Sequence, residues 1–302
     1  MTLAVESSSP KLTTKLTAFA ADIKISHTIF AMPWAVLATV MAWQRAGGPI
    51  VGKLAAILVC MVAARTAAMA ANRLLDAELD QKNPRTARRA IPSGALSARF
   101  VGVAMMLSAA LFVAATAVFW VVYDNFWPLA LSVPVLCFIC AYPLLKRFSR
   151  LCHYYLGAAL ALAPVCAWAA VSGSIAWPPV VMAGAVLCWT AGFDIIYACQ
   201  DFQSDRETGV VSVPAACGIG RALWISRGTH VAAMALLIVL GVNAPELSTL
   251  YFVGVVCAAG LLVTEHAIVR AEDLSKVGMA FFTINGIISL LIGTLGVIDV
   301  LV

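Results

Sequence analysis

Nine long apolar segments constrain the fold of this sequence more than any other feature. Each contains about 20 mostly apolar residues, the length that an α-helix needs to cross the hydrocarbon core of a bilayer. The composition agrees, because 62% of the 302 residues are hydrophobic and only 12% are charged, which excludes a cytosolic enzyme, a disordered protein and a secreted disulfide scaffold. We place the segments at 25–43, 51–71, 101–122, 127–145, 153–172, 178–199, 222–242, 248–269 and 278–300.

The expected fold class is therefore all-α, a polytopic membrane protein with nine transmembrane helices. We expect one transmembrane domain over residues 1–302. Residues 1–24 precede the first span and form a short amphipathic lead-in. Two connections, 72–100 and 200–221, are much longer and more polar than the others.

The basic residues predict how the chain is oriented in the membrane. All but three of the 20 Lys and Arg residues fall in the lead-in or in the connections on one side. The exceptions are Arg45 and Lys53 on the opposite side and Arg65 inside a span. Because cytoplasmic loops carry the excess of Lys and Arg, we expect a multi-pass protein of the cell membrane with both long loops in the cytoplasm. Basic residues interleaved with aromatic ones are not apparent, so we expect no nucleic-acid partner.

Carboxylates are regularly spaced in each of the long connections. Asn72, Asp76 and Asp80 follow the second span at intervals of four residues, which predicts that they share one face of an α-helix. Asp201 and Asp205 follow the sixth span at the same interval, and Asp194 lies seven residues earlier on the same stripe. Each group lies at the cytoplasmic end of a span, where carboxylates are costly unless they pair or serve a site.

Two facing stripes of oxygen ligands are suited to a hard divalent cation. Mg²⁺ is usually shared between one or two carboxylates and the phosphates of a substrate, and nearby basic residues can neutralise the remaining phosphate charge. A single Asp-x-x-x-Asp pair is more often a solvated helix face, but two pairs at the ends of spans favour a site. The spacing alone predicts a membrane protein with a site for Mg²⁺ and a phosphorylated ligand.

The two motifs and their flanks resemble the UbiA superfamily of intramembrane aromatic prenyltransferases. The first family motif, Asn-x-x-x-Asp-x-x-x-Asp, is matched by Asn72, Asp76 and Asp80, and the second, Asp-x-x-x-Asp, by Asp201 and Asp205. The segments RTAAMAANR, NPRTARRAIPSG and AYPLLKRFS extend the resemblance over nearly the whole chain. The resemblance implies nine helices around a central cavity with cytoplasmic cap loops. Arg73 departs from the pattern, since many members carry Asp after the first Asn.

The finer resemblance is to the branch assigned to menaquinone synthesis through futalosine. It rests on IKISHTIFAMPWA, LCHYYLGAALALAPVCAWAAVSG and FDIIYACQDFQSDRETGVVSVPA. The 4-hydroxybenzoate polyprenyltransferases of ubiquinone synthesis have much the same pattern and are the alternative. The implied reaction is transfer of a polyprenyl group from its diphosphate to a ring carbon of an aromatic acid, with release of pyrophosphate. We expect a dihydroxynaphthoate-type acceptor, with the lipid bilayer around the protein.

The resemblance also implies roles for individual residues. One Mg²⁺ is expected on Asn72, Asp76 and Asp80, and another on Asp201 and Asp205. The diphosphate is expected to contact basic side chains, and the carbocation to face Tyr142, Tyr197 and Asp194. Interfacial anchoring is the common alternative for a tyrosine, as is pairing with an interior donor for Asp194. The expected diphosphate residues are Arg65, Lys146, Arg147, Arg85, Arg89 and Arg206, and those for the aromatic acceptor are Lys24 and His27.

A cation-coupled transporter is the competing function of another class. Its carboxylates would bind the coupling ion, but such proteins keep ionisable groups near the midplane, often at broken helices in symmetric halves. Here the acidic residues of the motifs gather at one membrane edge, which disfavours transport. A non-enzymatic assembly role explains neither motif.

Overall fold

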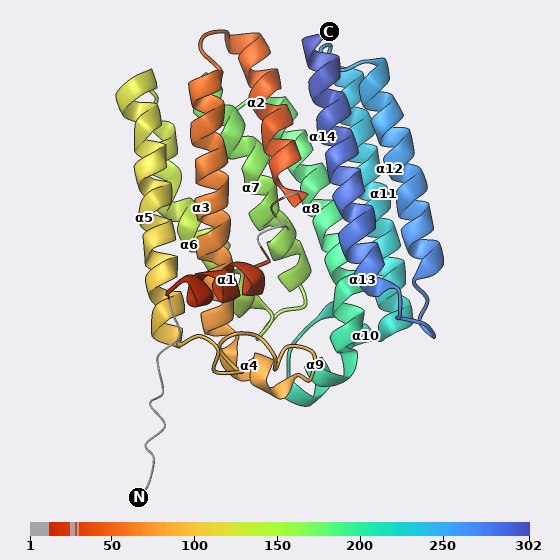
Figure 1. Ribbon diagram of the computed structural model, residues 1–302. Helices are drawn as coiled ribbons and strands as arrows, with labels where there is room; N and C mark the ends of the chain where they lie inside the picture. The colour runs from red at the N-terminus through yellow and green to blue at the C-terminus, as the bar shows by residue number, and fades with distance from the viewer. Residues whose placement is uncertain (1–11, 25–27, 29) are drawn as a thin grey trace, which may run out of the picture.

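The computed structural model describes residues 12–24, 28 and 30–302, and these form an α-helical bundle without a β-strand (Figure 1). The described residues outside helices form turns and one isolated bridge between Arg270 and Asp273. The helices are α1 (Leu12–Asp22), α2 (Met32–Ala46), α3 (Val51–Leu75), α4 (Ala77–Lys82), α5 (Ala98–Tyr123), α6 (Trp127–Leu145), α7 (Cys152–Ser172), α8 (Trp177–Ala198), η2 (Cys199–Asp201), α9 (Phe202–Thr208), α10 (Val213–Cys217), α11 (Ile219–Asn243), α12 (Thr249–Ile268), α13 (Val277–Met279), η3 (Ala280–Ile284) and α14 (Asn285–Leu301).

Eight helical segments of the described chain are long and apolar enough to cross a membrane. They match the second to ninth segments predicted from the sequence. The first predicted segment, 25–43, differs from the structure in its described part, because α2 begins only at Met32, with Pro33 in its first turn. Residues 25–27 and 29 of that segment lie outside the described residues. With 15 residues α2 is shorter than the eight spans, but it packs against α7 and α14 within the same bundle.

Close helix contacts depend on small residues at particular positions. Gly157 of α7 lies against the backbone carbonyl of Leu187 in α8, where a Cβ atom would overlap the carbonyl oxygen. Small residues let membrane helices approach closely, so that van der Waals contacts hold the bundle together. The α7–α8 pair forms one wall of the bundle, and α3, α5 and α6 form the opposite one.

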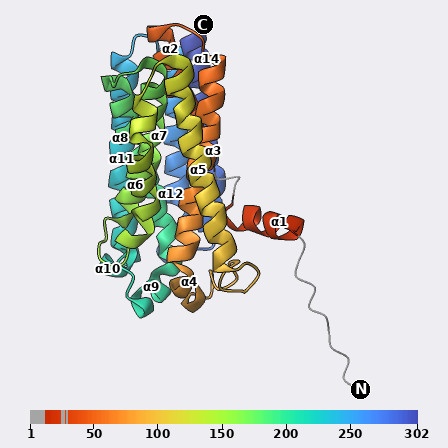
Figure 2. The same ribbon diagram turned by 90° about the vertical axis from the view of Figure 1, so that its left-hand side faces the viewer.

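The polar elements gather at one end of the bundle, where α1, α4, α9 and α10 lie, whereas the chain ends at the other (Figure 1). Helix α1 lies across the bundle axis and projects to one side (Figure 2). Two contacts hold α1 to the bundle. Arg73 donates to Asp22 at 3.0 Å, and Phe19 packs edge-on against Phe100. Asp22 also accepts a hydrogen bond from the backbone N–H of Ala90, which ties the 72–100 connection to the same point.

The helix that carries the first motif is interrupted at Asp76, but its three motif residues still line one cavity. Helix α3 ends at Leu75, Asp76 adopts φ −95° and ψ 0°, and α4 begins at Ala77. Asp is a weak helix former, and here its carboxylate pairs with Lys146 at 2.6 Å. Backbone hydrogen bonds from Asp76 to Asn72 at 2.9 Å and from Asp80 to Asp76 at 2.7 Å continue across the interruption.

Candidate active site

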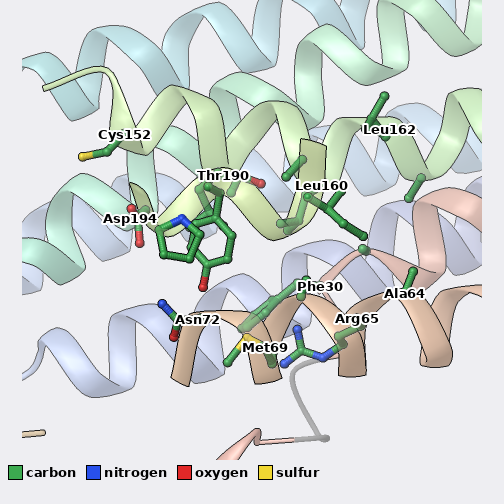
Figure 3. Close-up of a pocket in the computed structure, with 18 of the residues that line it drawn as sticks. Phe30, Ala64, Arg65, Met69, Asn72, Cys152, Leu160, Leu162, Thr190 and Asp194 are labelled. Carbon is green, nitrogen blue, oxygen red and sulfur yellow. The ribbon is translucent and has the colours of Figure 1, made fainter. Parts of the chain in front are cut away.

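A cavity of about 460 Å³ lies between the two walls of the bundle and contains both carboxylate motifs. Asn72 and Arg65 project into it from α3, while Asp194 and Thr190 lie on the opposite wall, on α8 (Figure 3). All five residues expected to bind metal line this cavity. Beyond them the cavity is mostly apolar and continues to Trp127, the first residue of α6.

The first motif is buried and strongly cross-linked. Asp76 is 0% exposed, and its Oδ2 atom accepts hydrogen bonds from Asn72 at 2.5 Å and Lys146 at 2.6 Å. Burial raises the pKa of Asp76, and the neighbouring Lys146 ammonium opposes that rise. The Oδ1 atom of Asp76 is buried and has no hydrogen-bond partner among the described residues, so its lone pairs remain available to a cation.

Asp80, the last residue of this motif, is held by the connection that follows it. Nη1 of Arg89 donates to both of its carboxylate oxygens, at 2.7 and 2.9 Å. Thr86 donates to the backbone carbonyl of Asp80 at 3.1 Å. The carboxylate is thereby fixed at the edge of the cavity beside a guanidinium group.

The second motif is reached by side chains from the first connection. Arg85 binds both carboxylate oxygens of Asp201, at 2.8 and 2.6 Å, and Asn83 donates to one of them at 2.8 Å. Arg85 also donates to the Tyr197 hydroxyl at 2.9 Å, and its guanidinium lies 5.0 Å from the ring centroid. Asp205 accepts a hydrogen bond from Ser212 at 2.7 Å. The two motifs are therefore linked across one gap by Asn83 and Arg85.

Asp194 pairs with His153, the interior donor that the sequence left open. His153 Nδ1 lies 2.7 Å from the Asp194 carboxylate, and His153 Nε2 accepts a hydrogen bond from the backbone N–H of Val213 at 3.2 Å. Because Nε2 acts as an acceptor, the ring proton is on Nδ1, which donates to Asp194. This pair fixes the carboxylate on the cavity wall between the two motifs.

A second cationic group lies deeper along α3. Arg65 donates to the backbone carbonyl of Lys24 at 3.0 Å, and the Lys24 ammonium lies 4.9 Å from the ring centroid of Phe282. Burial lowers the pKa of Lys24, as do the nearby Arg89, Arg85 and Arg73 in smaller measure. His27, predicted beside Lys24, lies outside the described residues.

The other predicted side chains divide by whether they line the cavity. Tyr142 and Tyr197 line it, as do Lys146, Arg85 and Arg89. Arg147 instead donates to the backbone carbonyl of Leu75, and the Arg206 guanidinium lies 5.5 Å from the ring of Phe202. Neither is among the cavity-lining residues, so their contact with diphosphate remains a prediction without geometric support.

Two polar side chains of the site were missed at the sequence level. Asn83 and Ser212 hold the carboxylates of the second motif, but neither belongs to a spaced series of ligands. The Asn-Pro pair at 83–84 indicated only a turn. Their roles depend on contacts between distant parts of the chain, for which the sequence contains no local signal.

The carboxylates do not by themselves form a complete metal site. Within the described residues, no three His, Cys, Asp or Glu side chains converge as a metal centre would require. The site supplies oxygen ligands in two groups, with cations beside each. Such an arrangement suits Mg²⁺ that is shared between a few carboxylates and substrate phosphates, as hard cations of this kind are usually bound.

Solved structures of similar fold agree with this architecture. The apo structure of a UbiA homolog from Aeropyrum pernix K1 superposes with a TM-score of 0.81 and 31% sequence identity, covering 92% of this chain and 99% of that one. A UbiA homolog from Archaeoglobus fulgidus bound to DMAPP and Mg²⁺ has a TM-score of 0.67 at 18% identity, covering 94% and 99%. At that identity the second likeness concerns the fold alone.

The curated relatives match this chain over different shares of its length. The 4-hydroxybenzoate octaprenyltransferase of Edwardsiella ictaluri is 30% identical over 80% of this chain and 83% of its own length. The mitochondrial 4-hydroxybenzoate polyprenyltransferase of Arabidopsis thaliana is 31% identical over 66% of this chain, and the 4-hydroxybenzoate solanesyltransferase of Synechocystis is 37% identical over 47%. The chain spans about half the length of these last two proteins, 47% of each.

The family model described as the UbiA prenyltransferase family matches residues 31–287. This range begins just before α2 and ends within α14, so it contains both motifs and every helix that lines the cavity. The match confirms the resemblance expected from the motifs: the chain belongs to the UbiA prenyltransferase family.

Proposed function

We propose that the protein transfers a polyprenyl group from polyprenyl diphosphate to a ring carbon of 4-hydroxybenzoate, with release of pyrophosphate. The observation that carries this proposal is the cavity itself. Two carboxylate motifs and their cations lie at one end, and an apolar channel leads away from them. An acidic, Mg²⁺-binding end joined to a long apolar channel is suited to a diphosphate that bears a hydrocarbon chain.

The names of the relatives favour 4-hydroxybenzoate over the dihydroxynaphthoate-type acid that we expected first. Three relatives, from Edwardsiella ictaluri, Arabidopsis thaliana and Synechocystis, are named as 4-hydroxybenzoate prenyltransferases. Menaquinone synthesis rested only on the finer resemblance of three segments. We therefore adopt the ubiquinone-type reaction as the proposal and keep the naphthoate as its competitor.

The donor set at the cavity end fits Mg²⁺. Asn72, Asp76 and Asp80 would hold one ion and Asp201 and Asp205 another, and the unpartnered Oδ1 of Asp76 is an available ligand. A family member from Archaeoglobus fulgidus was solved with DMAPP and Mg²⁺, which supports the same cofactor here. Bound Mg²⁺ stabilises the negative charge of a departing diphosphate as a Lewis acid.

The cations beside the motifs would stabilise the leaving group. Lys146, Arg85 and Arg89 each donate to a motif carboxylate in this structure and line the cavity. Positively charged donors that are fixed before the reaction stabilise charge that develops in the transition state. As the allylic C–O bond breaks, its electron pair remains with the diphosphate, whose added charge these three side chains face.

The carbocation requires an electron-rich and dry environment. The rings of Tyr197 and Tyr142 line the cavity near the motifs and offer π-faces to a cation. The Asp194 carboxylate, oriented by His153, adds negative charge on the same helix as Tyr197, α8. Apolar side chains along the remaining channel exclude water, which would otherwise capture the cation.

The acceptor carboxylate would bind the deeper cationic group. Arg65 precedes Asn72 by seven residues, about 10 Å along a helix, and lies beside Lys24. This separation leaves room for one aromatic ring between the carboxylate and the reacting carbon. We therefore move the proposed role of Arg65 from the diphosphate to the acceptor, together with Lys24.

The polyprenyl tail would lie along α6. The cavity is lined from Lys146, just after this helix, to Trp127 at its start. A helix of 19 residues is about 29 Å long, close to the thickness of the hydrocarbon core. We propose that the diphosphate end faces the cytoplasm, because the basic residues gather at that end of the bundle.

Conversion of two acceptors by isolated membranes tests the proposal. Membranes that contain the protein are given labelled polyprenyl diphosphate, Mg²⁺ and either 4-hydroxybenzoate or 1,4-dihydroxy-2-naphthoate. We expect prenylated 4-hydroxybenzoate and free pyrophosphate. Conversion of the naphthoate alone would restore the menaquinone-type reaction, and ion or solute flux in liposomes without any product would favour a transporter.

A further inference from the structure

A second group of buried polar side chains lies beside the cavity, on α8, α12 and α14. Trp189, Glu265 and Asn285 are at most 2% exposed. None of the three is among the cavity-lining residues of the described chain. Polar and ionisable side chains are costly within a membrane protein unless they pair or serve a site. The reaction proposed above uses none of them directly, and no sequence motif contains them.

Asn285 is the centre of this group and uses its side-chain amide fully. Its Nδ2 atom donates to Glu265 Oε1 at 2.9 Å and to the backbone carbonyl of Ala280 at 3.0 Å. Its Oδ1 atom accepts from Trp189 Nε1 at 2.7 Å. The three partners fix the orientation of the amide, because a flipped amide would place its oxygen against two other oxygens. Aspartate, which lacks both donors, could not replace it.

The carbonyl that Asn285 binds belongs to a π-helical turn. Residues Ala280–Ile284 form this turn, and α14 begins immediately after it. A π-turn inserts one residue into the helical hydrogen-bond ladder, and such turns often occur at functional sites. The side chain of Asn285 satisfies the Ala280 carbonyl and anchors the turn to α12 through Glu265.

The π-turn carries Phe281, which forms part of the cavity wall. Its ring centroid lies 4.2 Å from that of Tyr197 and 5.2 Å from that of Phe193. Aromatic pairs at this separation contribute through both contact area and ring electrostatics. Tyr197 accepts a hydrogen bond from Arg85, which binds Asp201. The position of the turn is therefore linked to the second motif through ring contacts.

The next residue of the π-turn, Phe282, lies against Lys24, which belongs to the cationic part of the proposed acceptor site. The Lys24 ammonium is 4.9 Å from the centroid of the Phe282 ring. One short turn thus places one ring beside Tyr197 and the other beside Lys24. In the proposed function Tyr197 faces the carbocation and Lys24 binds the acceptor carboxylate, so the turn lies beside both the reacting end and the carboxylate end of the aromatic acceptor.

We propose that Asn285 is a positioning residue for the aromatic acceptor, because its hydrogen bonds to Ala280 and Glu265 hold the π-turn that presents Phe281 and Phe282. This inference rests on the proposed function and deepens it. The substrate class concerned is a small aromatic acid, whose ring packs against Phe281 at the cavity wall, while Phe282 lies against the ammonium of Lys24. The polyprenyl diphosphate, bound at the carboxylates and along α6, is connected to the turn only indirectly, through Tyr197 and Arg85, so its binding should depend on the turn much less.

The first test is the Asn285→Ala variant in nanodiscs, assayed with 4-hydroxybenzoate and a polyprenyl diphosphate. We expect the KM for the acceptor to rise about three- to tenfold, the range that corresponds to losing one well-packed aromatic contact. The KM for the diphosphate should stay within about twofold, the scatter of an ordinary substitution away from a site. An equal change in both values, or none in either, would overturn the proposal.

Ser226→Ala is the matched control. Ser226 is also 0% exposed and donates from α11 to the Gly192 carbonyl in α8, so the variant loses one buried interhelical hydrogen bond without touching the π-turn. We expect a smaller fall in Tm, because one buried hydrogen bond is lost rather than three, and an unchanged KM for the acceptor. A rise in acceptor KM equal to that of Asn285→Ala would show a general effect of destabilisation and would contradict the inference.

Substitutions of Glu265 keep the inference testable if Asn285→Ala fails to fold. Glu265→Gln retains an oxygen that accepts from Asn285, whereas Glu265→Leu does not. We expect the Gln variant to keep the wild-type acceptor KM and the Leu variant to raise it. Equal values for the two variants would contradict a role through this hydrogen bond.

Two measurements without turnover separate this inference from the proposed function. Amide hydrogen exchange over residues 280–284 should be faster in Asn285→Ala than in Ser226→Ala, because the turn loses its anchor. The Kd of wild-type protein for 4-hydroxybenzoate should be lower than that of Asn285→Ala. Absent wild-type turnover would refute the proposed function, whereas unchanged exchange and Kd in Asn285→Ala would refute the inference.

Discussion

The two carboxylate motifs lie in one cavity but are held in different ways. In the first, Asn72, Asp76 and Asp80 are each at most 7% exposed, and Asn72 donates directly to Asp76. In the second, the side chain of Asp201 is 14% exposed and its guanidinium partner, on Arg85, is 33% exposed. One motif is fully built into the bundle, whereas the other is partly exposed and is held by a side chain from a connection.

This difference in burial indicates that the two motifs have different roles in binding the substrate. Buried carboxylates that already have partners are preorganised, so little rearrangement is needed when a charged ligand binds. The Asp201 carboxylate is held instead by a guanidinium that is one third exposed, and water weakens an ion pair of this kind. We infer that the first motif fixes the position of the diphosphate, whereas the second exchanges partners as the substrate binds and leaves.

The largest expected effect is the loss of turnover when one carboxylate of either motif is removed. Asp76→Ala should lower kcat about 1,000-fold and Asp201→Ala about 100-fold, the upper and lower ends of the range for losing one preorganised charge-stabilising group. Water can take over part of the role of the partly exposed Asp201 carboxylate, but it cannot do so for the buried Asp76 carboxylate. The measurement is product formation in membranes with Mg²⁺, normalised to inserted protein.

Exposed acidic residues of the same segments provide the controls. Glu78 lies between Asp76 and Asp80, and Glu207 follows Asp205 on α9, where it accepts from Gln203. Glu78→Ala and Glu207→Ala should retain turnover within about twofold, as surface substitutions usually do. A greater loss in Asp201→Ala than in Asp76→Ala would reverse the proposed division between the motifs.

The Mg²⁺ concentration needed for turnover should also depend on the motif that is changed, by a smaller factor than kcat does. Chelation of Mg²⁺ with EDTA should abolish turnover, and added Mg²⁺ should restore it. Asp80→Asn should raise the half-saturating Mg²⁺ concentration about tenfold or more, at least the cost of losing an outer-shell partner of a metal, and Asp205→Asn should raise it less. Activity that survives EDTA, with Mg²⁺ curves that match the wild type in both variants, would remove the metal assignment.

The buried motif should also determine the acidic side of the pH profile. Burial raises the pKa of Asp76 and Lys146 opposes that rise, so removing the ammonium raises it further. Since an ionised Asp76 is needed to bind Mg²⁺, turnover in Lys146→Met should fall at a higher pH than in wild type, by about one unit or more. The control is Lys82→Met at the exposed end of α4, and an acidic limb at the wild-type pH in Lys146→Met would contradict the role of Asp76.

Local features of this chain could be predicted from its sequence because their causes are local. The apolar segment 101–122 became α5, Ala98–Tyr123, since length and hydropathy alone define such a span. The positions of the two motifs, after the second and the sixth predicted spans, correctly placed both groups at one end of the bundle. The start of α2 could not be found in this way, because it lies at Met32, within a longer apolar stretch.

The partners of the site residues could not be predicted, since they are distant in the sequence. Lys146 lies 70 residues from Asp76, and Arg85 lies 116 residues from Asp201. Spacing within one segment predicts which residues share a face, but it contains no information about which segment packs opposite. The π-turn that Asn285 anchors could not be predicted for a related reason. The hydrogen-bond partners of the Asn285 side chain lie in three different helical segments.

The smallest expected effect concerns Ser212, which holds Asp205 in the more exposed motif. Its hydroxyl donates to the Asp205 carboxylate at 2.7 Å and accepts from the backbone N–H of Ala215 as the cap of α10. Ser212→Ala should lower Tm by the equivalent of about 1 kcal/mol, the usual cost of losing an N-cap. It should raise the half-saturating Mg²⁺ concentration less than Asp205→Asn does, because the carboxylate itself remains. Ser212→Thr retains the hydroxyl and should restore both values. If Ser212→Ala impaired Mg²⁺ binding as much as Asp205→Asn, the second motif would be as dependent on fixed partners as the first, and the contrast between the two would not hold.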